Sequence, residues 1–211
     1  MADVRRTFTG LEPDAVRANL DRVRERAGTE VAVLAAVKYV PSEELPALAE
    51  AGIELVGENR AQELVDKRAA HADLFTWDFI GQLQSRKVKE VAPEVRLIHS
   101  VASDSVLRKL EANPAPEVLI QVNVAGEEGK EGILPADLGD FIARCPVRVT
   151  GLSTMPPFAE DAEDNRRHFA RLAELAGEHG LERLSMGTTQ DYWVAAQEGA
   201  TIIRVGTALY A

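Results

Sequence analysis

The stretch Val31-Ala32-Val33-Leu34-Ala35-Ala36-Val37-Lys38 decides the fold, because seven apolar residues end there at one ammonium group. A short apolar run with β-branched residues is typical of a strand buried on both faces. A lysine at its end is expected at the mouth of a packed core, partly out of water, where desolvation lowers the pKa of its ammonium group. The neutral amine attacks carbonyl compounds and forms a Schiff base. For Lys38 by itself, a side chain reaching from the strand end into solvent is the simpler interpretation.

Further apolar runs recur along the chain and alternate with segments rich in Ala, Leu, Glu, Arg and Lys, which have helix-forming composition. The predicted strands are 31–37, 53–56, 76–80, 95–99, 118–124, 147–152, 183–186 and 201–205. The predicted helical segments are 42–51, 61–70, 104–111, 137–143 and 164–179. Such alternation implies parallel strands joined by crossover helices.

Eight strands with helices between them predict an α/β fold, a (β/α)8 TIM barrel. The chain stops at Ala211, which leaves no room for a helix after the last strand. An additional N-terminal helix, about 13–27, is expected to fill that gap, since Pro13 suits a first helical turn. We therefore predict a single domain over 1–211, with the barrel at about 31–211. An open doubly wound sheet is the competing architecture.

Composition narrows the possible functions. The chain has 211 residues and a formal net charge of −10, which argues against general affinity for nucleic acid or anionic membranes. Cys145 is the single cysteine, so no internal disulfide forms, and no apolar N-terminal stretch is present. These features predict a cytoplasmic protein. No His, Cys and Asp spacing indicates a metal site, and a monomer is expected.

Polar side chains follow nearly every predicted strand, at the barrel end where active sites form. After the last two strands, glycines stand beside hydroxyl residues, in Ser185-Met186-Gly187-Thr188-Thr189 and Arg204-Val205-Gly206-Thr207. Turns of this kind present backbone amides to anions, and barrels often bind phosphate there. A phosphorylated aldehyde would satisfy both the turns and Lys38, and pyridoxal phosphate is such a molecule.

Ordered motifs over almost the whole chain resemble the YggS/PROSC family of pyridoxal phosphate homeostasis proteins. They are VLAAVK (33–38), GENRAQE (57–63), FIGQLQ (79–84), HSV (99–101), QVN (121–123), GLSTM (151–155), LSMG (184–187) and RVGT (204–207). A set of motifs in the family's order is far more specific than any one of them.

The resemblance implies a barrel of the alanine-racemase N-terminal domain type, with pyridoxal 5′-phosphate held as a Schiff base on Lys38. It implies that Arg204 faces the pyridine nitrogen and that family members regulate vitamin B6 pools without a fast catalytic activity. Pyridoxal-phosphate-dependent apoenzymes are expected partners. The predicted cofactor-binding residues are Lys38, Asn59, Ser153, Ser185, Met186, Gly187, Thr188, Thr189, Arg204, Gly206 and Thr207.

The chain departs from the family pattern at three places. Asp78 stands where the family usually has histidine, which removes or reverses the charge there. Thr188-Thr189 replaces Met-Ser, which keeps a hydroxyl but adds a methyl group, and Tyr210-Ala211 replaces Phe-Gly.

Two enzymatic alternatives stay open. A pyridoxal-phosphate-dependent amino-acid racemase needs an acid or base on each face of the bound substrate; Lys38 could serve one face, and Tyr39, His99 or Tyr192 the other, although each of these three also suits a structural role. A Schiff-base aldolase acting on a sugar phosphate would likewise need a lysine and a phosphate site.

Overall fold

The computed structural model describes residues 7–211, so the start of the predicted domain, residues 1–6, lies outside the described residues. Eight parallel strands form a closed barrel in sequence order, and β1 pairs with β8 to close it. The open-sheet alternative is therefore wrong, and the predicted barrel is confirmed. The strands are β1 (Ala32–Ala36), β2 (Leu55–Glu58), β3 (Thr76–Phe79), β4 (Leu97–Val101), β5 (Glu117–Gln121), β6 (Val149–Ser153), β7 (Arg183–Thr188) and β8 (Ile202–Val205).

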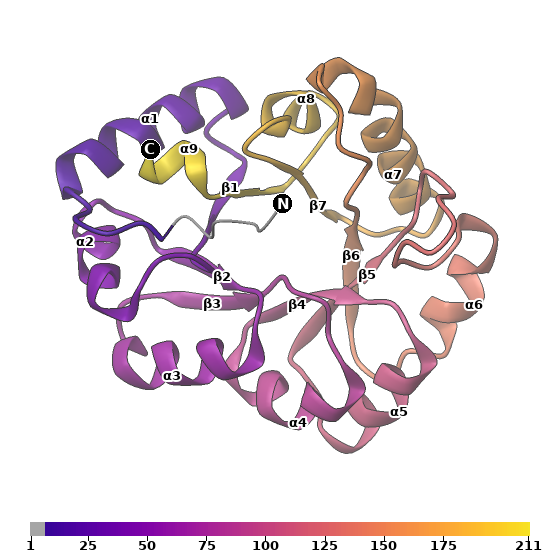
Figure 1. Ribbon diagram of the computed structural model, residues 1–211. Coiled ribbons are helices and arrows are strands. Elements are labelled where there is room, and N and C mark those ends of the chain that lie inside the picture. The colour runs from indigo at the N-terminus through magenta and orange to yellow at the C-terminus, as the bar shows by residue number, and fades with distance from the viewer. Residues whose placement is uncertain (1–6) are drawn as a thin grey trace.

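Helices surround the barrel on its outside (Figure 1). They are α1 (Pro13–Ala27), α2 (Leu45–Glu50), α3 (Ala61–His71), α4 (Val88–Val91), α5 (Asp104–Ala112), α6 (Leu138–Ala143), α7 (Arg166–Glu178), α8 (Tyr192–Gln197) and α9 (Thr207–Tyr210). Helices were expected between all the strands, but no bounds were predicted for α4 or α8, and α9 was not expected; each has at most six residues. Such short helices lack the repeated apolar spacing on which helix prediction depends.

A helix after the last strand is the main correction to the predicted fold. The four residues that follow Gly206 form α9, although the sequence was expected to leave no room for one. The predicted N-terminal helix, α1, lies beside it (Figure 1). The buried Asn19 of α1 donates a hydrogen bond from Nδ2 to the carbonyl of Leu209, at 2.9 Å. The N-terminal helix thus fixes the end of the chain next to β8 and β1.

Two apolar layers hold the barrel. Inside it, Leu34, Leu97, Leu119 and Ile202 form one buried cluster. A larger cluster fills the space between the strands and the helices, where side chains from alternate strand positions meet the apolar faces of the helices. Because the interior is filled below, chemistry is confined to the rim of the barrel.

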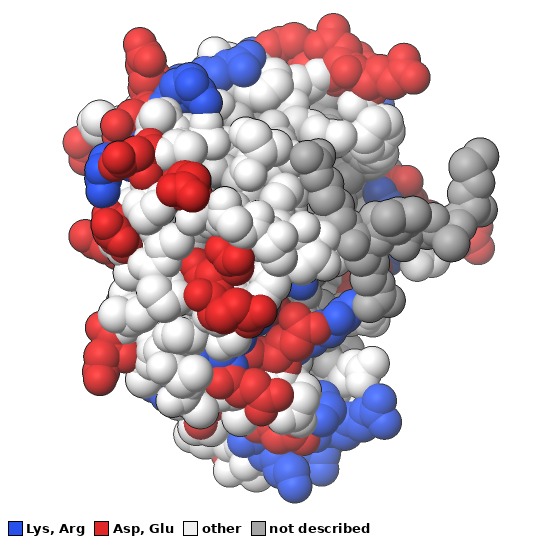
Figure 2. All heavy atoms as spheres, turned by 60° about the vertical axis from the view of Figure 1, so that its left-hand side comes forward, with Lys and Arg blue, Asp and Glu red and all other residues white. Residues whose placement is uncertain are grey.

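Surface charge matches the acidic composition. On the side of α2, acidic side chains are dispersed among uncharged ones, and basic side chains gather at the edges (Figure 2). This face therefore offers no continuous basic surface of the kind that nucleic acids need. Within residues 7–211, no helix combines the length and the hydropathy that a membrane span requires.

Candidate functional site at the barrel mouth

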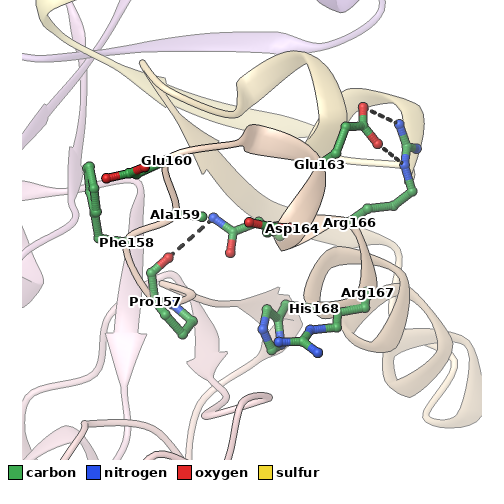
Figure 3. Close-up of a pocket in the computed structure, with 10 residues that line it drawn as sticks. Pro157, Phe158, Ala159, Glu160, Glu163, Asp164, Arg166, Arg167 and His168 are labelled. Atoms are coloured by element: carbon green, nitrogen blue, oxygen red, sulfur yellow. Dashed lines mark hydrogen bonds and ion pairs between the residues drawn. The ribbon is translucent and has the colours of Figure 1, made fainter.

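A cavity of about 400 Å³ lies at the carboxyl ends of the strands. Seven predicted residues line it, from the ends of β7 and β8 and from the segments that follow β1, β2, β7 and β8: Lys38, Asn59, Thr188, Thr189, Arg204, Gly206 and Thr207. A larger hollow, of about 900 Å³, lies beside the loop after β6 and contains none of the predicted residues. Its Arg166 is already paired with Glu163 (Figure 3). The rim cavity is therefore the candidate site.

Lys38 stands in a turn just after β1, and its side chain is exposed. Its Nζ lies 4.9 Å from the centre of the Tyr39 ring, which also lines the cavity. The expected withdrawal of Lys38 from water is wrong, because the strand ends two residues earlier, at Ala36. The amine is accessible to a molecule that enters the cavity.

Arg204 is the buried cation of the site. Its register places it beside Leu34 of β1, so it lies on the strand next to the one that leads to Lys38. One guanidinium nitrogen donates to the carbonyl and the hydroxyl of Ser185, both at 2.6 Å, and the other donates to the carbonyl of Thr154 at 2.8 Å. Burial lowers the pKa of Arg204 to about 10, so the guanidinium remains charged at neutral pH.

Asp191 organises the turn after β7. One of its carboxylate oxygens accepts from the Thr188 amide at 2.7 Å and from the Thr188 hydroxyl at 3.1 Å. The other accepts from Asn165 Nδ2 at 2.9 Å. The hydroxyl proton of Thr188 is thus already used, and Thr188 faces the cavity without a free donor in this arrangement. The sequence analysis did not identify Asp191, which the turn pattern Thr188-x-x-Asp191 could have suggested.

Thr189 joins the last two turns. Its hydroxyl oxygen accepts from the amide of Gly206 at 3.2 Å and from the amide of Ala208 at 3.4 Å. Both contacts use the oxygen as an acceptor, so its proton stays available to a ligand. Thr189, which stands where the family pattern has serine, therefore keeps the hydroxyl group at this position.

Asn59 supplies a polar atom that has no partner. Its Oδ1 is buried and accepts no hydrogen bond in the described structure. Its backbone amide is held by Glu58 Oε2 at 2.8 Å. Buried polar atoms without partners are rare in folded proteins, and an unfilled one beside a cavity points to a ligand donor.

The other four predicted residues do not line the cavity. The hydroxyl of Ser153 donates to the carbonyl of His99 inside the barrel, and Ser185 lies beneath Arg204. Met186 is fully buried in the outer core. Gly187 has φ of +87°, and a Cβ there would lie 2.6 Å from the Ala195 side chain, so it allows α8 to pack against β7.

A chain of buried polar groups runs from Arg204 into the barrel. His99 Nδ1 lies 2.8 Å from the Ser185 hydroxyl, and His99 Nε2 lies 3.0 Å from Asp78. Burial lowers the pKa of His99, so the ring is neutral at pH 7. Burial raises the pKa of Asp78, but hydrogen bonds from His99 and Arg96 outweigh this effect and lower it overall.

These charge states set the direction of every bond in the chain. An ionised Asp78 can only accept, so His99 donates from Nε2 and accepts at Nδ1. Ser185 therefore donates to His99 and accepts from Arg204. Asp78, which replaces the family's histidine, is paired with Arg96 at 2.5 Å. The carboxylate that acts on the charge of Arg204 is Asp191.

Several lining residues were not predicted. Phe8, Ala36, Ile80, Met155 and Gln190 complete the cavity with mainly apolar surface. Their signals were weak, because apolar residues in loops are common. Of the three acid–base candidates, Tyr39 lines the cavity, whereas His99 and Tyr192 do not.

The comparisons with known proteins agree with this geometry. The family model of the alanine racemase N-terminal domain matches residues 11–211. A pyridoxal phosphate homeostasis protein of Aquifex aeolicus is 40% identical, covering 92% of this chain and 94% of the relative. The chain belongs to the pyridoxal phosphate homeostasis protein family. The Pseudomonas aeruginosa member is 38% identical over 92% of this chain and 91% of its own. The resemblance inferred from the motifs is confirmed.

Solved structures give the same picture. PipY of Synechococcus elongatus, solved without pyridoxal phosphate, superimposes with a TM-score of 0.84 at 31% identity, covering 93% of this chain and all of PipY. The same protein with pyridoxal phosphate bound gives 0.81 at 30% identity, covering 93% of this chain and all of PipY. The alanine racemase of Corynebacterium glutamicum matches at 0.72 with 18% identity, covering 95% of this chain and 61% of the racemase, which shows the shared barrel.

Proposed function

We propose that this chain binds pyridoxal 5′-phosphate and serves in vitamin B6 homeostasis, with Lys38 as the covalent anchor. The observation that carries the proposal is one cavity that holds an accessible amine, a buried cation and two hydroxyl-bearing turns. A family relative whose structure contains pyridoxal phosphate supports the choice of ligand.

The residues present fit this ligand. A cavity of about 400 Å³ is large enough for a small phosphorylated ring. The apolar side chain of Ile80 and the thioether of Met155 line it, as a flat aromatic ring requires. The unpartnered Oδ1 of Asn59 can accept from a hydroxyl group of the ligand. When bound, pyridoxal phosphate supplies an aldehyde that condenses with an amine to give a Schiff base.

Each residue of the cavity then has a defined task. Lys38 would present its amine from the β1 turn, and the Thr189 hydroxyl would hold the phosphate with backbone amides of the last two turns. The amides of Thr188, Gly206 and Ala208 are already bonded within those turns. Arg204 presents a permanent cation beside them. A guanidinium opposite the pyridine nitrogen would keep that nitrogen unprotonated, which weakens the ring as an electron sink.

We infer a carrier rather than a fast enzyme. A racemase needs an acid or base on each face of its substrate, and of the three candidates only Tyr39 is a lining residue of the described cavity. His99 instead bonds to Ser185 and Asp78, and Tyr192 is a buried residue of α8 itself. The aldolase alternative loses support because the relatives are named for pyridoxal phosphate.

The remaining expectations are proposals about the whole protein. We propose that residues 1–211 form one functional domain, that it acts as a monomer in the cytoplasm, and that it exchanges its ligand with pyridoxal-phosphate-dependent apoenzymes. A protein with one accessible anchoring amine can release its ligand by hydrolysis or by transfer to another amine.

The test is a titration of the purified chain with pyridoxal phosphate, followed by borohydride reduction and peptide mapping. We expect a yellow complex and a pyridoxyl adduct on Lys38, both absent in Lys38→Ala. A colourless protein without an adduct would contradict the proposal. Exchange of the α-proton of L-alanine in heavy water, above the rate with free cofactor, would restore the racemase alternative.

A further inference from the structure

The turn that presents Lys38 is held by a donor from outside the turn. Val40 donates its amide to the carbonyl of Val37 at 3.0 Å, which makes Lys38 and Tyr39 the central residues of a β-turn. The same carbonyl accepts a second hydrogen bond, from Lys67 Nζ of α3, at 2.8 Å. The carbonyl directly before Lys38 is therefore saturated, with one lone pair in the turn and one on a buried ammonium group.

Lys67 is itself a buried ion. Its side chain is 9% exposed, and it pairs with Glu58, whose side chain is fully buried at the end of β2. The other carboxylate oxygen of Glu58 accepts from the backbone amide of Asn59 at 2.8 Å. One ion pair thus holds two backbone segments of the cavity, those of Lys38 and Asn59. Buried ion pairs seldom stabilise a fold more than apolar residues of the same size, so their retention points to a positional role.

The side chain of Lys38 has no such restraint. Within the described residues, its Nζ makes no hydrogen bond or ion pair, and it lies over the Tyr39 ring. Because the side-chain torsions of Lys38 are unrestrained, the position of its backbone decides where the amine can meet an aldehyde. Precise placement therefore has to come from the turn, because a misplacement of about 1 Å costs on the order of 100-fold in rate.

We propose that Lys67, neutralised by Glu58, is a positioning residue that places the Lys38 amine for condensation with an aldehyde. The inference rests on the proposed function. In that condensation the neutral Lys38 amine adds to the aldehyde carbon, a carbon–nitrogen double bond replaces the carbon–oxygen double bond, and the oxygen leaves as water with the two amine hydrogens. Lys67 does not contact the reacting atoms; it acts through the carbonyl of Val37.

The test compares two ligands that share a ring and a phosphate. Pyridoxal 5′-phosphate has the aldehyde, and pyridoxine 5′-phosphate carries an alcohol in its place and cannot condense. The variants are Lys67→Met, Lys67→Arg and the double variant Glu58→Gln with Lys67→Met, which removes both charges of the buried pair. Glu63, which lies 3.7 Å from Lys67 Nζ, keeps Arg60 as its partner. Lys109→Met, at an exposed position of α5, controls for the loss of one positive charge.

We expect borohydride-trapped adduct at Lys38 to form about 10- to 100-fold more slowly in the double variant, while its dissociation constant for pyridoxine phosphate stays unchanged. Lys67→Arg should recover part of the rate, because a guanidinium can still donate to the Val37 carbonyl. Lys109→Met should behave as the unaltered chain does. Thermal unfolding shows which variants are folded, and the double variant carries the test if Lys67→Met unfolds.

Two contrary outcomes are distinguishable. If the unaltered chain forms no adduct at Lys38, both the proposed function and this inference fail. If the unaltered chain forms the adduct but the double variant forms it equally fast, or loses affinity for both ligands in parallel, only the positioning role is contradicted.

Discussion

The lysine turn and the anion turns lie on neighbouring strands of the barrel, but the structure holds them in different ways. The Lys38 side chain is exposed. Only the backbone before it is held, by the hydrogen bond from Lys67 to the Val37 carbonyl. Arg204 is buried, and its own guanidinium is bonded to three carbonyl or hydroxyl groups.

The difference teaches how one cavity can combine reaction with recognition. A group that has to form and break a covalent bond needs a mobile side chain on a fixed backbone. A group that recognises an anion or a ring nitrogen needs a fixed side chain, because rigid donors lose little entropy when the ligand binds. Substitutions of Arg204 and of the turns after β7 and β8 should therefore lower the free energy of unfolding, and substitutions of Lys38 should not.

The largest expected effect is at Arg204. Arg204→Met removes the donor to the Thr154 carbonyl and to both oxygens of Ser185, of which the carbonyl keeps the Thr154 amide at 3.3 Å. The free energy of unfolding should fall by roughly 3 kcal/mol. Arg204→Lys keeps the charge but not the planar fork and should fall in between. Urea unfolding measures both. A loss below about 0.5 kcal/mol in Arg204→Met would remove the proposed contrast between the two sides.

The buried polar groups Ser185, His99 and Asp78, which are hydrogen-bonded inside the barrel, predict that the free energy of unfolding depends on pH. The folded-state pKa of His99 is lowered by burial from 6.5, so below that pH the unfolded chain binds a proton that the folded chain does not. Stability should thus fall as the pH drops from 6.5 towards the lowered pKa, by up to about 1.4 kcal/mol per pH unit.

His99→Gln should show a shallower slope in this window, measured by urea unfolding between pH 7 and pH 5. The control is His71→Gln, since His71 lies on α3 and does not belong to the hydrogen-bonded group of Ser185, His99 and Asp78. Equal slopes in the unaltered chain and His99→Gln would mean that His99 is not held neutral.

Thr189 tests the link between the last two turns. Thr189→Val removes the oxygen that accepts from the amides of Gly206 and Ala208 and should lower the free energy of unfolding by about 1 kcal/mol. The same change should weaken phosphate binding. Thr189→Ser keeps the oxygen and should match the unaltered chain in both measurements; a weakened Thr189→Ser would assign the effect to the methyl group.

The smallest expected effect is on the lysine side. Lys38→Ala should change the free energy of unfolding by no more than about 0.5 kcal/mol, because the side chain is exposed. It should nevertheless abolish the trapped adduct. Unfolding measured without ligand separates the two readouts. A strongly destabilised Lys38→Ala would show that the side chain is restrained in the folded protein.

The sequence predicted the barrel and the strand ends well, but it predicted the lining of the cavity less completely. The run before Lys38 and the later apolar runs carry local information, since a strand's composition depends on its own burial. Lys38 and Asn59 were found because they follow such runs, and Arg204 because it lies in the last of them. Lys67 was missed because its partner, the Val37 carbonyl, lies 30 residues away in the sequence. Asp191 was missed although its partner Thr188 is only three residues away.

Ser185, Met186 and Gly187 were predicted to bind the cofactor but do not line the cavity, and the pairing of β7 with β8 bears on the reason. The pairing register of β7 and β8 shifts between Ser185 and Thr188, so three steps along β7 oppose two steps along β8. A bulge of this kind changes which face each side chain takes. Ser185 points to the barrel interior and Met186 to the outer core, as alternation along a strand requires. After the shift, Gly187 still faces α8, and Thr188 lines the cavity.

The sequence by itself determined the order of strands and helices, the acidic charge and the residues that follow each strand, because these depend on composition and local hydrophobic periodicity. Only the tertiary structure decided which of those residues share the cavity, that Lys38 is exposed while Arg204 is buried, and that Lys67 supports the lysine turn. The physical reason is that burial, register and hydrogen-bond partners are set by contacts between segments far apart in the chain.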